Sequence, residues 1–84
     1  MYNAAKPRRK GISGRASVSE RAQVGQECYI GDFAVVEEDA VIGEGCQIYP
    51  QVYVGRGVRI GDNTTLYPGV KIYEGCIVGA NCIL

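Results

Sequence analysis

An unbroken six-residue repeat of branched aliphatic side chains runs through this sequence of 84 residues. Every sixth residue from Ile12 to Leu84 is Ile, Val or Leu: Ile12, Val18, Val24, Ile30, Val36, Ile42, Ile48, Val54, Ile60, Leu66, Ile72, Val78 and Leu84. A short fixed period of this kind is typical of repeat architectures, in which each unit buries its apolar face by stacking on its neighbours. The repeat therefore constrains the fold class more strongly than any local pattern.

A second column of small residues lies two positions before each aliphatic residue. Its members are Ala16, Ala22, Cys28, Ala34, Ala40, Cys46, Val52, Val58, Thr64, Val70, Cys76 and Cys82. Residues two apart in a strand point to the same face, so we expect both columns to face inward. The third place after the aliphatic residue often holds a residue that tolerates positive φ. These residues are Gly45, Gly57, Asn63, Gly69, Gly75 and Asn81. Each repeat thus predicts one short strand and one turn.

The repeats together predict an all-β parallel β-helix, in which three strands form a triangular coil of eighteen residues and coils stack about 4.8 Å apart. The same spacing relates the glycines Gly25, Gly43, Gly61 and Gly79, and it relates Tyr49-Pro50 to Tyr67-Pro68. Residues 12–84 then form about four coils, while the hand of the helix stays open at this point. Leu84 begins the core layer of a fifth coil, so we expect a truncated helix that belongs to a longer protein or is completed by another chain.

Charge is unevenly distributed although the formal net charge is zero. The acidic residues fall almost entirely after residue 21, and an acidic body argues against nucleic-acid binding. A basic run precedes it: Lys6, Arg8, Arg9 and Lys10. We interpret residues 1–11 as a solvated basic linker, with contact to an acidic partner or to phosphates as the alternative. No apolar stretch is typical of a membrane span or secretory leader, so we expect a cytoplasmic protein.

The sequence contains no histidine, which removes the commonest general base and the usual Ser/His and Cys/His nucleophile arrangements. Glu37, Glu38 and Asp39 form a carboxylate cluster that we interpret as an exposed turn rather than a catalytic pair. No glycine-rich phosphate loop remains once the glycines are assigned to turns. The residues themselves therefore predict no catalytic and no cofactor-binding side chain, and substrate-binding residues stay unknown.

The four cysteines all fall in the small inward column: Cys28, Cys46, Cys76 and Cys82. Their spacings match no zinc-binding pattern, so we predict no metal site. Cys28 and Cys46 are expected to lie one above the other, but parallel side chains in stacked strands have poor disulfide geometry. We expect four buried free thiols, which behave as small apolar side chains in a reducing compartment.

One outer face is rich in aromatic side chains, and its outward positions include Tyr29, Tyr49, Tyr67 and Ile83. The face with the glycine column adds the apolar residues Val41 and Ile77. Exposed apolar rows on a small solenoid predict contact with a neighbouring chain, whereas aromatic pairing between stacked strands is the alternative explanation. We expect a chain that is not a stable monomer, and we favour side-by-side trimers over end-to-end stacking.

Three stretches resemble the start of the β-helix in the UDP-3-O-acylglucosamine N-acyltransferase family of lipid A biosynthesis. They are residues 29–36, 48–52 and 63–73, the last running on to 81–84. The Tyr-Pro turns and the ending Asn-Cys-Ile-Leu are the most specific elements of the resemblance. Asp32 departs from it, because members of this family commonly have proline at that place.

The resemblance implies a left-handed helix built from hexapeptide repeats and a parallel homotrimer with active sites between subunits. It implies transfer of a 3-hydroxyacyl chain from acyl carrier protein to a UDP-linked sugar, without a cofactor. The catalytic histidine of the family would lie beyond residue 84, so the chain alone is expected to be inactive. Two alternatives stay open: another hexapeptide-repeat O-acyltransferase, and a non-catalytic β-helix that acts as a structural or assembly module.

Overall fold

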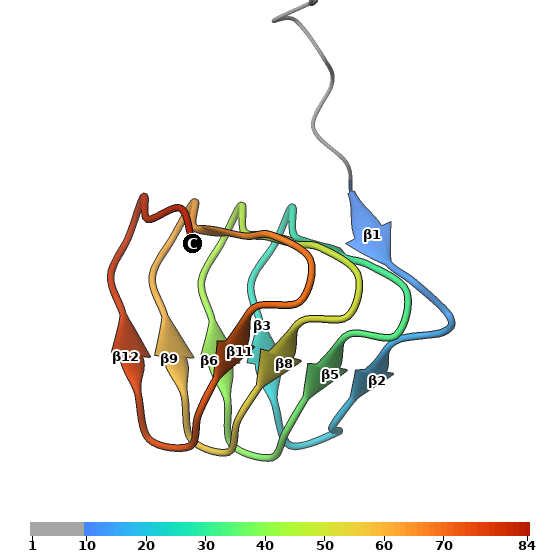
Figure 1. The fold of residues 1–84 in the computed structure, drawn as a ribbon, viewed down its shortest axis with the longest axis horizontal. Helices are drawn as coiled ribbons and strands as arrows, with labels where there is room; N and C mark the ends of the chain where they lie inside the picture. The colour runs from blue at the N-terminus through green and yellow to red at the C-terminus, as the bar shows by residue number, and fades with distance from the viewer. Residues whose placement is uncertain (1–9) are drawn as a thin grey trace, which may run out of the picture.

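The computed structural model describes residues 10–84, and these form short strands separated by tight turns (Figure 1). The strands are β1 (Gly11–Ile12), β2 (Ser17–Val18), β3 (Gln23–Val24), β4 (Tyr29–Ile30), β5 (Val35–Val36), β6 (Val41–Ile42), β7 (Gln47–Ile48), β8 (Tyr53–Val54), β9 (Arg59–Ile60), β10 (Thr65–Leu66), β11 (Lys71–Ile72) and β12 (Ile77–Val78). Each strand ends on one residue of the aliphatic column, as the repeat predicts. Most of the segment interpreted as a basic linker, including Lys6, Arg8 and Arg9, lies outside the described residues.

Successive strands belong to three different parallel sheets, which form the sides of a triangular solenoid of about four turns (Figure 1). The first sheet has the order β1-β4-β7-β10, the second β2-β5-β8-β11 and the third β3-β6-β9-β12. Ile12 pairs with Ile30, and Ile30 pairs with Ile48, so neighbouring strands are eighteen residues apart. A parallel bridge from Thr65 to Ile83 continues the first sheet. The predicted parallel β-helix with an eighteen-residue coil is confirmed.

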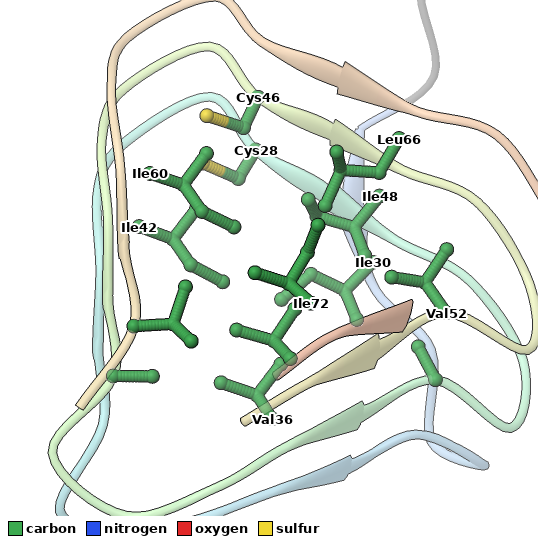
Figure 2. Packing of buried hydrophobic residues seen from close by; sticks show 14 residues of the cluster. Cys28, Ile30, Val36, Ile42, Cys46, Ile48, Val52, Ile60, Leu66 and Ile72 are labelled. Carbon is green, nitrogen blue, oxygen red and sulfur yellow. The ribbon is translucent and has the colours of Figure 1, made fainter. Parts of the chain in front are cut away.

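The aliphatic side chains converge inside the triangle and form one core (Figure 2). Ile30, Ile48 and Leu66 stack along the first sheet and are fully buried. Burying an aliphatic side chain of this size contributes about 1.5–3 kcal/mol to folding. The aliphatic residues at the two ends of the helix are much more exposed than those in its middle: Ile12 is 52% exposed and Leu84 is 50% exposed. The core is therefore formed mainly by the two middle coils, β4–β6 and β7–β9.

Three corners connect the sheets: the first follows the first sheet, the second follows the second sheet, and the third leads to the next coil. All six Gly and Asn residues that the repeat places in turns have positive φ. Four other residues adopt it at the equivalent place, namely Glu27, Phe33, Asp39 and Gln51. Left-handed backbone costs about 1–2 kcal/mol for such residues, so the stacking of the coils overrides their local preference.

The glycine column at the third corner is explained by close approach between coils. A Cβ atom added at Gly61 would lie 2.5 Å from the backbone nitrogen of Ala80, and one added at Gly25 would lie 2.8 Å from that of Glu44. Real Cβ atoms do not approach backbone this closely, so a side chain would force the coils apart. The eighteen-residue glycine spacing read from the sequence thus reflects backbone stacking.

The small column at the third corner also donates hydrogen bonds to that glycine backbone. Cys28 Sγ donates to the carbonyl of Gly43 at 3.0 Å, and Cys46 Sγ donates to that of Gly61 at 3.2 Å. Thr64 Oγ1 makes the equivalent bond to Gly79 at 2.7 Å. The Cys28 and Cys46 thiols therefore donate the same hydrogen bond that the Thr64 hydroxyl donates one coil later.

The expectation of four buried thiols is wrong for two of them. Cys28 and Cys46 are buried, but Cys76 is exposed and Cys82 is half-buried. Both belong to the inward column, yet they lie in the last coil, where no further coil covers them. Burial also raises the pKa of the Cys46 thiol, which keeps it in its unreactive protonated form.

Substituting Gly61 by alanine tests the close approach of the coils. We expect Gly61→Ala to lower the free energy of unfolding by at least about 2 kcal/mol, because the added methyl group meets the backbone of Ala80. Gly14→Ala is the matched control, since a Cβ there meets nothing within 4 Å, and its unfolding free energy should stay unchanged or rise by up to about 1 kcal/mol. Urea unfolding followed by circular dichroism measures both. Equal destabilisation would contradict the packing explanation.

Thiol alkylation in the folded protein tests the cysteine positions. We expect N-ethylmaleimide to modify Cys76 first and Cys82 next, while Cys28 and Cys46 stay protected because they are buried. Peptide mass spectrometry over a time course gives the order, and all four thiols should react rapidly in concentrated urea. Early modification of Cys46 in the folded protein would show that the inward column is placed wrongly.

Candidate functional site

The most extended cluster of aromatic side chains runs along the first sheet and its corner. Tyr29 projects outward from β4, while Tyr49 and Tyr67 are the first residues after β7 and β10. The ring centroids of Tyr29 and Tyr49 are 5.8 Å apart in an edge-on arrangement, and those of Tyr49 and Tyr67 are 5.2 Å apart. Aromatic pairs favour such offset and edge-on geometries. The predicted aromatic row is therefore a continuous stack of three rings.

The residues of this row differ in solvent exposure. Tyr29 and Tyr49 are half-buried, and Tyr49 packs against the core. Tyr67 is 48% exposed and Ile83 is 69% exposed. Gln47 lies on the same outer face and is nevertheless buried. Pairing between stacked aromatic side chains therefore accounts for Tyr29 and Tyr49, whereas contact between Tyr67 or Ile83 and a neighbouring chain stays a prediction.

Exposed apolar side chains elsewhere are concentrated in the last coil. Val41 is half-buried, whereas Ile77 on the same sheet is 78% exposed. The sequence interpretation missed Tyr73, which is 68% exposed, and Phe33, which is 61% exposed. Both occupy turn positions, and the eighteen-residue column that contains each of them would have identified them as outward-facing.

The carboxylate cluster does not form a paired acid and base. Asp39 forms an ion pair with Arg21 at 3.5 Å across the coils. The Glu37 carboxylate instead lies by the Tyr53 hydroxyl, and burial together with Glu37 raises the pKa of that phenol. Two members of the cluster thus contact different neighbours. Asp39 is exposed as expected for a solvated turn, whereas Glu37 and Glu38 are half-buried.

The first coil is joined to the second by ion pairs at all three corners. Lys10 contacts Glu27 at 2.7 Å, and its hydrogen bond and charge hold the pKa of that exposed carboxyl below its usual range. Arg15 contacts Asp32 at 3.6 Å, and Ser13 also donates to this carboxylate. Lys10, Glu27 and Cys28 line an open hollow of about 420 Å³. Exposed pairs of this kind contribute little energy each.

No described residue group has the composition of a metal site, because residues 10–84 bring no three Cys, Asp or Glu side chains together in a suitable cluster. Within the same residues, no helix is long and apolar enough to span a membrane. The described surface has an aromatic row along its first sheet.

Comparison with solved structures finds mutants of perosamine N-acetyltransferase from Caulobacter crescentus, in complex with CoA and GDP-perosamine. Two of these structures are each 26% identical to the chain, cover 87% of it, and have TM-scores of 0.36 and 0.28. The chain spans 46% of the length of those acetyltransferase chains. Comparison with curated proteins finds no significant match.

A family model described as bacterial transferase hexapeptide (six repeats) matches residues 21–56 and 57–84. The matched residues include every coil after the first, and hexapeptide repeats of this kind indicate a left-handed β-helix. The hand that periodicity left open is thereby assigned. Because the match covers more than half of its residues, the chain belongs to the bacterial transferase hexapeptide family.

Proposed function

We propose that residues 12–84 are the β-helix part of an N-acyltransferase that transfers a 3-hydroxyacyl chain to UDP-3-O-acylglucosamine in lipid A biosynthesis. The observation that carries this proposal is the run of hexapeptide repeats over residues 21–84, which is characteristic of bacterial transferases. The Tyr-Pro turns and the ending Asn-Cys-Ile-Leu favour this transferase over others with the same repeats. The basic residues 1–11 would then link the helix to a preceding uridine-binding domain.

The reaction needs a base that the described residues do not supply. The sugar amine forms a bond to the thioester carbonyl carbon, the carbon–sulfur bond breaks, and the amine proton passes through a base to the departing carrier thiolate. A base suited to neutral pH is most often histidine, and this chain has none. The raised pKa values of Tyr53 and Cys46 keep both groups protonated, so neither replaces it.

The role of this segment is therefore to hold other parts of the enzyme in place. A stack of hydrogen-bonded coils is rigid, and rigid elements position catalytic groups better than loops do. The proposed enzyme acts in the cytoplasm as a homotrimer, with acyl carrier protein and a UDP-sugar as its substrates. An O-acyltransferase built from the same repeats is compatible with the same observations.

A different class of function is favoured by the absence of histidine from all 84 residues. A β-helix without a catalytic base acts as a structural or assembly module, in which the ladder sets the spacing between partners. The exposed apolar side chains of the last coil suit such contacts.

Release of the carrier thiol distinguishes the two functions. We expect the 84-residue chain to release no thiol above the buffer rate from 3-hydroxyacyl acyl carrier protein and UDP-3-O-acylglucosamine, because it has no suitable base. The complete product of the encoding gene should release it, as measured with a thiol-reactive dye and confirmed by mass spectrometry of the sugar. Turnover by the 84-residue chain would contradict the placement of the base. No turnover by the complete product would favour the assembly module.

A further inference from the structure

The first coil, which contains strands β1–β3, makes weaker apolar contact with the core than the coils that follow it. Ile12 is exposed, and Val18 and Val24 are only half-buried. Its inward column holds the small residues Ala16 and Ala22, which bury little apolar surface. In the second coil, β4–β6, the aliphatic residues at the same places are buried. Apolar packing therefore contributes less to attaching the first coil than to joining the middle coils.

Ion pairs connect the first coil to the second at every corner, and each has its cation at the first coil and its acid in the second. The pairs are Lys10 with Glu27 at 2.7 Å, Arg15 with Asp32 at 3.6 Å, and Arg21 with Asp39 at 3.5 Å. Within residues 10–84, these are all the ion pairs that the structure shows between charged side chains. Attraction between opposite charges is thus confined to the contact between these two coils.

The three acids occupy turn positions at which the later coils have residues that favour turns. Those coils have Gly45, Asn63 and Asn81 in place of Glu27, Gly57 and Gly75 in place of Asp39, and Pro50 and Pro68 in place of Asp32. Glu27 and Asp39 also adopt positive φ, which glycine and asparagine tolerate better. The requirements of the turns therefore do not explain the acids, whereas the cation that each of them contacts does.

We propose that the first coil is a detachable cap, held closed by its three ion pairs, which opens as one unit when these charges are screened or removed. Each pair contributes little alone, because both partners are exposed. All three pairs favour the same closed form, so their small effects multiply in the equilibrium constant for opening. A segment with few buried apolar contacts is the part of a fold that opens at low free energy.

Opening of the cap exposes an apolar layer that the closed form covers. The residues of this layer are Ile30, Val36 and Ile42, each paired with one aliphatic residue of the first coil and buried in the closed form. Ionic strength then decides whether this end of the helix presents the small residues of the first coil or the branched side chains of the second. The inference depends on no step of the proposed acyl transfer.

Amide hydrogen exchange measured by NMR detects this opening at single residues. The amides of Ser17, Gln23 and Gly25 donate to carbonyls of the second coil, so they exchange with solvent when the first coil detaches. The amides of Val35 and Val41 donate from the second coil to the third and serve as matched controls within the same molecule.

Raising the sodium chloride concentration from about 0.01 M to about 1 M shortens the screening length from about 30 Å to about 3 Å. We expect the three first-coil amides to exchange about tenfold faster relative to the controls, and by similar factors, because the pairs weaken together. First-coil exchange that does not respond to salt, or that is unprotected at low salt, would overturn the proposal. Equal acceleration of the control amides, or unequal factors within the first coil, would overturn it as well.

Reversing the charges of one pair tests the same contact without salt. Arg21→Glu and Asp39→Arg should each accelerate first-coil exchange about fivefold at low salt, and the double variant should return it to within about twofold of the unchanged protein. Arg59→Glu is the control for net charge, since Arg59 is exposed in the third coil and forms none of the three pairs, and it should leave this exchange unchanged. Circular dichroism checks that each variant folds. A double variant that exchanges as fast as the single variants would show that the pair does not hold the cap.

Discussion

The backbone ladder between successive coils is the interaction on which the rest of this structure depends. The nitrogen of Tyr29 donates to the carbonyl of Cys46 at 2.9 Å, and the nitrogen of Gln47 donates to that of Thr64 at the same distance. Turns are included in the ladder, since the nitrogen of Gln51 donates to Asp32 at 3.1 Å. Because the whole backbone is held in register, each turn must adopt the conformation that its neighbours impose.

Much of the fold follows from the sequence because two spacings are visible in it. The six-residue spacing predicts every strand, and the eighteen-residue spacing of glycines predicts how the coils stack. The positive φ of Glu27 and Phe33 has no local signal, since it comes from the coils above and below. The exposure of Cys76 also has no local signal in the sequence, because burial in a solenoid depends on whether another coil covers the residue.

The sequence predicts which residues form the candidate surface but not how far each of them is buried. The aromatic row could be predicted because Tyr49 and Tyr67 repeat at the coil spacing. The packing of Tyr49 against the core could not be predicted, because it depends on how rings from two different columns meet. The absence of histidine from the 84 residues can be read from the sequence alone.

The three corners of the triangle are chemically different, although every repeat has six residues. The third corner has donors at Cys28, Cys46 and Thr64, and each serves a glycine carbonyl of the next coil. The same column holds Ala34 and Val52 at the first corner, which carry no side-chain donor. Gaining or losing six residues would therefore move every later repeat to the wrong corner and leave these carbonyls without a side-chain hydrogen-bond donor. The unit that such a helix can duplicate or delete during its evolution is the whole coil of eighteen residues.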